Sequence, residues 1–318
     1  MTLRRGHRIA LFTSGGIGGA AAALAAGFAG LIYGEVKLAE RRIPKANTLP
    51  PESNDTIWAA AGVSRTRPPI RIAMLGDSTA AGYGVFRDRD TPGARLAIGI
   101  SEAARRPVHL TNVAVVMIGA NDVTERTKPA LAVSFLEETV RRLRALGAEV
   151  IVGTCPDLGT IRPLAQPLRA YARHLSRDMA KEQTVAVVRA GGRTVSLGDL
   201  LGPLFMRHRE LFAEDQFHPS AAGYAEAASA VLPSCLDALG LRTRARSASA
   251  FTTRRVKPAR KAAAQAVAHP GTEVAGAERF GRSAGRRGPF AQLRRRRPRK
   301  PSRTSPEAAV PVSAVPSN

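Results

Sequence analysis

Three short stretches of this 318-residue sequence carry polar side chains that could perform chemistry. They are GDSTAAGYG at 76–84, GAND at 119–122 and DQFHP at 215–219. The first two follow apolar runs typical of buried strands, and the third precedes an alanine-rich segment typical of a helix. Within the first two stand Ser78, a hydroxyl nucleophile, and Asn121, a side-chain amide donor.

These residue types suit nucleophilic attack on a carbonyl carbon. A serine hydroxyl is a weak nucleophile until a neighbouring base removes its proton, and His218 is the natural base for Ser78. Asp215 stands three residues before His218, close enough to orient the imidazole and stabilise its protonated form. The Asn121 amide and the backbone N–H of Ser78 are donors of the kind that form an oxyanion hole. The pattern predicts a Ser-His-Asp hydrolase site.

Each residue also has a purely structural interpretation. Ser78 could cap a helix, Asp215 and His218 could form a structural ion pair, and Asn121 could occupy a turn. Asp157, which follows another apolar run, could reach the same cleft, but a turn-capping role is favoured. The combination favours catalysis, because all three stretches fall where an α/β fold gathers its ligand site.

Apolar patterning predicts the elements that must position these residues. Short stretches rich in apolar residues indicate strands, and apolar residues at helical spacing indicate helices. Strands that alternate with helices predict a parallel sheet covered on both faces, an α/β fold over residues 70–241. Strands are expected at 70–76, 108–118, 148–154 and 184–188, and helices at 92–105, 129–147, 164–183 and 219–240.

The three stretches resemble the sequence blocks of the SGNH hydrolases, the GDSL-like esterase and lipase family. GDS matches the first block with Ser78 as nucleophile, although Thr79 replaces the usual Leu. GAND matches the third block with Asn121, and DQFHP matches the fifth, which implies Asp215 and His218. The resemblance implies a three-layer α/β/α, flavodoxin-like parallel sheet, and ester hydrolysis through an acyl-enzyme. It implies no cofactor and no metal.

One block of that family is missing. The family has a second strand ending in an oxyanion-hole Gly, then a helix, then a third strand ending before the Asn. Here VHLTNVAVVMIGAND (108–122) runs directly from one strand-like half into the other. Parallel strands need a crossover of about a dozen residues or more, so 108–118 can form only one strand. We expect it to lie beside the first strand, in a sheet of four strands where the family has five, with an impaired oxyanion hole.

The amino terminus predicts a membrane segment. Ile9 to Gly34 is a run of 26 uncharged residues, long enough to span a bilayer core. A cleaved signal peptide has a shorter apolar core of about 7–15 residues, so a retained anchor within residues 1–37 is favoured. Basic residues flank both ends, which leaves the orientation open. The proline-containing stretch 38–69 is expected to be a linker, and the catalytic domain is expected to be exported or held outside the cytoplasm.

The net charge of +23 is concentrated in the carboxyl-terminal segment. Residues 242–318 hold 19 Lys or Arg against three acidic residues, a net +16, which leaves +7 for residues 1–241. Little apolar periodicity is present there, so a disordered basic tail is expected, dispensable for folding. Its run Arg294 to Arg297 could contact anionic lipid or nucleic acid, although a solvated tail is the simpler interpretation. Cys155 and Cys235 are compatible with a bridge or with two buried thiols.

Two hypotheses remain open. The first is a membrane-anchored serine esterase or lipase acting on an acyl ester small molecule or lipid. The second is a catalytically inactive relative that serves as an anchored binding or scaffold protein. Retention of Ser78, Asp215 and His218 favours the first. The acyl length and the substrate-binding residues are not determined by the sequence.

Overall fold

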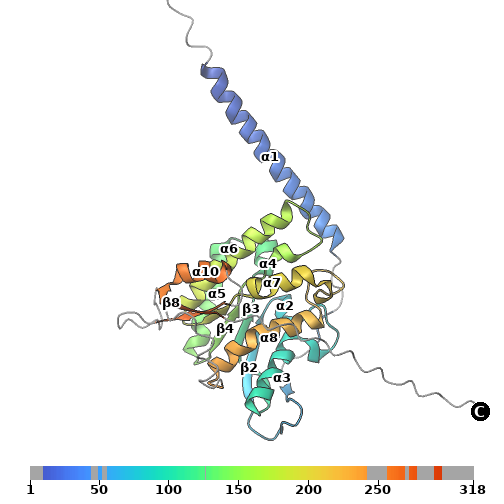
Figure 1. Ribbon diagram of the computed structural model, residues 1–318, viewed down its shortest axis with the longest axis vertical. Coiled ribbons are helices and arrows are strands. Elements are labelled where there is room, and N and C mark those ends of the chain that lie inside the picture. The colour runs from blue at the N-terminus through green and yellow to red at the C-terminus, as the bar shows by residue number, and fades with distance from the viewer. Residues whose placement is uncertain are drawn as a thin grey trace, which may run out of the picture.

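A computed structural model describes residues 10–43, 49–51, 56–125, 127–241, 256–268, 272–277 and 290–295. One mixed sheet organises the described chain, with helices on both of its faces, and a long helix extends away from this body (Figure 1). The α/β/α architecture expected from the alternation of strands and helices is confirmed.

The centre of the sheet is parallel. β2 (Ile70–Gly76), β3 (Val108–Met117), β4 (Val150–Gly153) and β5 (Arg193–Val195) lie side by side in that order. Four parallel strands were expected, and four are present. The whole described sheet has eight strands, however, because antiparallel strands that the sequence analysis did not predict extend it beyond β5, and a further short antiparallel strand pairs with the start of β3.

The stretch 108–117 forms one strand, as expected, and that strand lies between β2 and β4. Its pairing with β2 is irregular in its first half, before the junction of the two strand-like halves at Val116 and Met117. From Arg71 to Ala73 β2 advances two residues, whereas β3 advances five, from His109 to Ala114. The extra residues form a bulge, which lets the stretches of β3 before and after it keep parallel pairing to the same neighbour.

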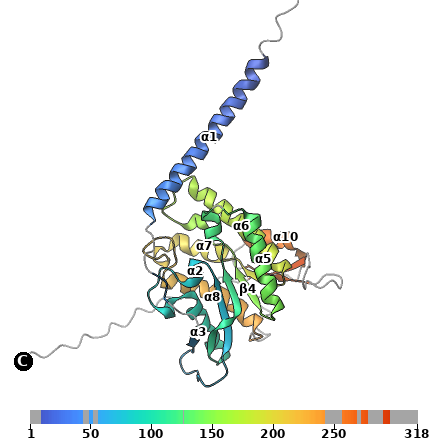
Figure 2. The ribbon, with the colours of Figure 1, turned by 180° about the vertical axis from the view of Figure 1, so that it is seen from behind.

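Helices cover the sheet in two layers. α3 (Pro92–Ala104) and α8 (Ala221–Ala238) pack on one face, and α5 (Pro129–Ala145) and α6 (Leu168–Arg189) on the other. Figures 1 and 2 show the two pairs on opposite sides of β3 and β4. The arrangement follows from short apolar strands that are buried on both faces.

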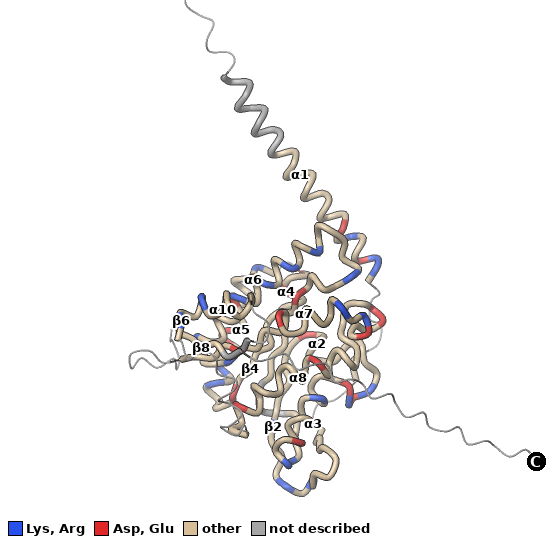
Figure 3. The backbone as a smooth tube through the Cα atoms, viewed as in Figure 1, with Lys and Arg blue, Asp and Glu red and all other residues tan. Residues whose placement is uncertain are grey.

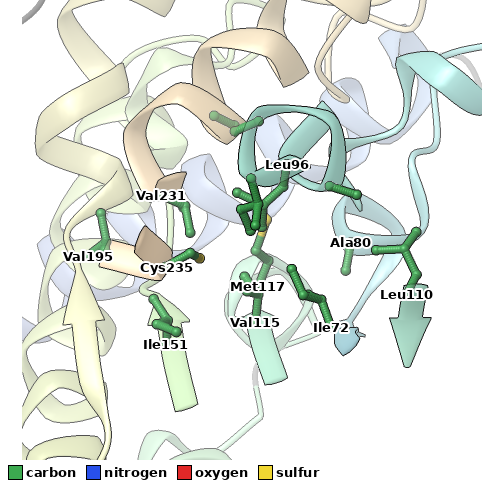
Figure 4. Close-up of a cluster of buried hydrophobic side chains, with 14 of the residues drawn as sticks. Ile72, Ala80, Leu96, Leu110, Val115, Met117, Ile151, Val195, Val231 and Cys235 are labelled. Atoms are coloured by element: carbon green, nitrogen blue, oxygen red, sulfur yellow. The ribbon is translucent and has the colours of Figure 1, made fainter. Parts of the chain in front are cut away.

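Strand alternation divides the core in two. On β3, Val115 and Met117 point toward α3 and α8, whereas Val116 points toward α5 and α6. On β4, Ile151 belongs to the first cluster and Val152 to the second. Figure 4 shows the first cluster, in which side chains from β2 to β5 meet those of the two helices. This period of two is the reason that both faces of such strands must be apolar.

Shorter elements complete the domain. They are α2 (Ser78–Ala81), η1 (Asp88–Asp90), α4 (Ala120–Thr124), η2 (Leu158–Thr160), α7 (Leu197–Arg207) and η3 (Arg209–Leu211). β1 (Ile57–Trp58) pairs antiparallel with the start of β3, and Trp58 packs against the first core cluster. Part of the segment 38–69, expected to be a linker, therefore belongs to the sheet.

The stretch TVAVV, 184–188, was expected to be a strand and is instead the last part of α6. All five residues are buried there, and four of them are apolar, so the helix is covered around its whole circumference at this end. A helix that is apolar all round must be covered on all sides, and a short apolar run cannot be told from a strand by periodicity. The fourth parallel strand is β5, five residues later.

The cover on that end of α6 comes from the basic carboxyl-terminal segment. β6 (Lys257–Pro258), α10 (Ala259–Ala268), β7 (Thr272–Gly276) and β8 (Phe290–Arg295) fold back onto the domain. β7 pairs antiparallel with β5, and Ala262, Ala266 and Val274 enclose Val188 in a third cluster. The expectation of a disordered segment from 242 onward is therefore wrong for these stretches, and whether they are dispensable for folding stays a prediction. Small alanine side chains allow close packing without a strong apolar signal. The residues after 295 lie outside the described part of the chain.

α1 (Ala10–Arg42) is the long helix that leaves the body. Its stretch Ala22–Arg42 is the one candidate membrane span among the described residues, with a mean hydropathy of 1.3. The helix runs past the predicted end of the apolar segment, so residues 38–42 are helical and not part of a linker. In Figure 3 its described upper part is uncharged, and charged residues begin near its base.

Candidate active site

The structure brings Ser78, His218 and Asp215 together across 140 residues of sequence. His218 Nε2 lies 2.9 Å from Ser78 Oγ, and His218 Nδ1 lies 2.6 Å from Asp215 Oδ2. The imidazole thus bridges a hydroxyl and a carboxylate through its two nitrogens. Its side chain is only 13% exposed, and that of Asp215 is 9% exposed, so water has little access to the hydrogen bond between them.

A tight turn holds Asp215 in place. Its Oδ1 accepts hydrogen bonds from the backbone N–H groups of Phe217 and His218, both at 2.9 Å. The turn depends on Gln216 at a φ of 55°, in the left-handed region. Burial disfavours the charged carboxylate, but the bonds from the His218 ring and the two N–H groups outweigh it and lower the pKa of Asp215. Asp215 therefore stays ionised beside the imidazole.

Ser78 is the first residue of α2, directly beyond the end of β2. Asp77 caps the helix by accepting the N–H of Thr79 at 3.0 Å, which fixes the loop around the hydroxyl. Gly76 has a φ of 150°, and a Cβ there would overlap the carbonyl oxygen of Met117, so only glycine lets the two strand ends approach this closely. Burial raises the pKa of Asp77.

The serine loop and the histidine loop are also packed together. A Cβ on Gly84 would lie 3.3 Å from the Cβ of His218 and closer still to the chain on either side of it. The Tyr83 ring lies 5.5 Å from the imidazole, centroid to centroid. Buried Tyr224 of α8 donates its hydroxyl to the Tyr83 carbonyl at 2.7 Å. These contacts set the distance between Ser78 and His218.

Asn121 lies in the first turn of α4, just beyond β3, on the edge of the sheet where β2 also ends. It is half-buried, and its side-chain amide has no hydrogen bond to any residue that the structure describes. Gly119, at a φ of 126°, makes the turn from the strand into this helix. The expected donor is thus placed at the same rim as Ser78 and is not engaged elsewhere in the described chain.

Sequence reasoning missed Gln183. This buried residue of α6 accepts the N–H of Cys155 at 2.7 Å and donates to the Ile118 carbonyl at 3.1 Å. Its side chain therefore ties the loop after β3, which carries Asn121, to the loop after β4. A glutamine in a helix gives no signal by itself, because its role depends on which two loops the fold brings to it.

A cavity adjoins the three motif loops. Among its lining residues are Asp77 and Thr79 on either side of Ser78, and Phe217 and Pro219 on either side of His218. Asp157 also lines it. That side chain caps the turn of η2 and forms an ion pair with Arg173, at 3.1 Å. Both interpretations of Asp157, a turn cap and a cleft residue, therefore apply.

The two cysteines are buried free thiols on different elements, so the disulfide alternative does not hold in this structure. Burial raises the pKa of the Cys155 thiol, which keeps it protonated. Among the described residues, no group of three or more His, Cys, Asp or Glu side chains gathers as a metal site would require.

Comparison with known proteins gives three findings. The sequence model of the GDSL-like Lipase/Acylhydrolase family matches residues 92–226, which include Asn121, Asp215 and His218 but begin after Ser78. A GDSL-like esterase of Mycobacterium tuberculosis is 36% identical over 267 residues, covering 74% of this chain and 85% of that esterase. An alpha/beta hydrolase enzyme from the metagenome of Lake Arreo, Spain, is 20% identical and matches 58% of this chain and 99% of its own, with a TM-score of 0.34.

Proposed function

Because this chain belongs to the GDSL-like lipase/acylhydrolase family, and is therefore an esterase-type hydrolase, we propose that it cleaves carboxylic esters through an acyl-enzyme on Ser78. The observation that carries the proposal is the pair of hydrogen bonds that His218 makes. One nitrogen faces the Ser78 hydroxyl at 2.9 Å, and the other faces the Asp215 carboxylate at 2.6 Å. This is the geometry that nucleophile activation requires.

In the first half of the reaction, His218 Nε2 takes the proton of Ser78 as Oγ attacks the ester carbonyl carbon. Asp215 stabilises the resulting imidazolium through Nδ1. As the tetrahedral intermediate collapses, its C–O bond to the alcohol breaks, and His218 delivers the proton to the departing oxygen. Water then attacks the acyl-serine, with His218 again taking a proton, and releases the carboxylic acid and free Ser78.

The developing oxyanion needs donors, and the proposal assigns this role to the Ser78 N–H and the Asn121 amide. Support comes from the position of Asn121 at the same sheet edge and from its amide, which bonds to no described residue. We propose that the family's second-block Gly has no counterpart here, and the single strand β3 between β2 and β4 supports this. Since losing one donor typically lowers turnover by about 10²–10³, the chain is proposed to be a slow esterase.

The test uses p-nitrophenyl acetate and a fluorophosphonate that labels activated serines. Ser78→Ala and His218→Ala are each expected to abolish hydrolysis and labelling. Asn121→Ala is expected to lower turnover by about 10²–10³ while the activated phosphonate still labels Ser78. His208→Ala is the matched control, because that histidine is exposed and pairs with Glu210. Full activity in Ser78→Ala would refute the assignment. Absence of labelling in the natural chain would favour the inactive binding protein.

We also propose that α1 is a retained membrane anchor. Its base is joined to the catalytic domain: Glu35 accepts the N–H of Leu168 at 2.8 Å, at the start of α6. Ala39 is buried, and Ile43 packs in a cluster with Phe217, the neighbour of His218. Cleavage after Ile43 would remove these contacts, which support the wall of the site. Full-length protein is expected in the membrane fraction, and a soluble mature form that lacks the apolar run would contradict the proposal.

A further inference from the structure

The cavity beside the motif loops has a volume of about 80 Å³. It extends inward from the residues that flank Ser78 to buried apolar side chains of the core, such as Met117, Leu158 and Leu197. α7 supplies one wall, since Leu197, Leu201 and Phe205 recur at the spacing of a single helical face. The cavity is thus formed mainly by the fold's own core.

The polar side chains in its wall are already bonded within the protein. Thr160 donates its hydroxyl to the carbonyl of Asp157 at 2.8 Å. The Asp157 carboxylate accepts the N–H of Gly159 at 2.9 Å and is neutralised by Arg173. A buried polar group of a ligand would find few free partners there, so the cavity favours an apolar occupant.

We infer that this cavity binds the acyl chain of the ester, and that the chain length it accepts is short to medium. The inference rests on the proposed function. The acyl group stays bonded to Ser78 Oγ while the alcohol leaves, so an inward cavity next to Ser78 suits the group that is retained. At about 10–15 Å³ for each water-sized group, 80 Å³ holds about five to eight chain atoms. Esters of butyrate to octanoate fit this space.

The absence of a side chain at Gly202 leaves part of the cavity open. This glycine lies on α7, is buried, and lines the cavity opposite Asp157. A Cβ at this position would meet the nearest heavy atoms, the Cβ and Oδ2 of Asp157, at 3.5 and 3.6 Å, which is ordinary van der Waals contact. A methyl group therefore fits without displacing the backbone, and it occupies volume that the acyl chain would use.

Gly202→Ala tests the inference with little risk to the fold, since alanine is favoured over glycine inside a helix by about 1 kcal/mol. The readout is the ratio of kcat/KM for p-nitrophenyl hexanoate to that for the acetate. One methylene in an apolar pocket changes discrimination by about 10–200-fold, so the ratio is expected to fall at least tenfold. Leu204→Ala, also on α7 but not lining the cavity, is expected to leave the ratio unchanged.

Leu201→Ala provides the opposite change, because it enlarges the cavity and is expected to raise the ratio. A series of acetate esters with alcohols of increasing length distinguishes an effect on the alcohol part of the substrate from an effect on the acyl part. If Gly202→Ala alters the alcohol series and not the acyl series, or alters neither, the acyl assignment is wrong. If the natural chain hydrolyses no p-nitrophenyl ester and binds no phosphonate, the proposed function itself is wrong, which is a different result.

Discussion

Gln183 offers a direct test of how the site is held together. Its two hydrogen bonds, to the N–H of Cys155 and the carbonyl of Ile118, join the loops after β4 and β3. Gln183→Met keeps nearly the same volume but removes both bonds. It leaves two backbone groups without this partner in a buried place, and each such group costs about 1–3 kcal/mol. The expected loss of unfolding free energy is therefore about 2–6 kcal/mol.

Urea unfolding measures that loss, and p-nitrophenyl acetate hydrolysis measures its effect on the site. Because the Ile118 loop leads to Asn121, kcat is expected to fall more than KM changes. Gln166→Met is the control, since Gln166 is exposed and makes only a local bond, to the N–H of Ala170. Loss of less than about 0.5 kcal/mol in Gln183→Met, within the range of a surface substitution, would show that the two loops do not depend on this bridge.

Gln183→Glu adds a pH-dependent readout. The introduced carboxyl still accepts the N–H of Cys155, but it can donate to the Ile118 carbonyl only when it is protonated. Burial and the facing carbonyl favour the protonated form, so the folded pKa of this carboxyl is raised above its unfolded value. The folded state then binds the proton more tightly, and stability is regained as pH falls through the raised pKa. A stability deficit that is independent of pH would contradict this reasoning.

Three further predictions concern stability. The lowered pKa of Asp215 means that its charge stabilises the fold above its ordinary pKa of about 3.9, and that this contribution is lost as pH falls through the lower folded value. In Asp215→Asn, the unfolding free energy should therefore depend less on pH in the acid range. Burial raises the pKa of Asp77, so Asp77→Asn, which can still cap α2, should raise unfolding free energy at pH 7, and the gain should vanish in acid where Asp77 is protonated. Truncation after Leu241 uncovers Val188, and burial of that side chain alone contributes about 1.5–3 kcal/mol to the unfolding free energy, so a lower Tm is expected. An unchanged Tm would show that the carboxyl-terminal elements do not support the domain.

The sequence was enough to choose the candidate residues of the site. The candidate residues could be chosen without a structure because a serine, an amide, an aspartate and a histidine of suitable type each stand next to a stretch whose pattern predicts a strand or a helix. They are Ser78, Asn121, Asp215 and His218. The single-strand nature of 108–117 was also determined, since chain length forbids a crossover within it. These inferences depend on properties of short segments, which the sequence contains in full.

The tertiary structure decided what those segments meet. TVAVV became a helix end because α10 covers it, and α10 gave no signal of its own because its buried face is made of alanines. The role of Gln183 and the apolar cavity arise where several loops converge, and no one of those loops predicts the convergence. Burial depends on neighbours far along the chain, so a local pattern can indicate what a segment prefers but not what will finally surround it.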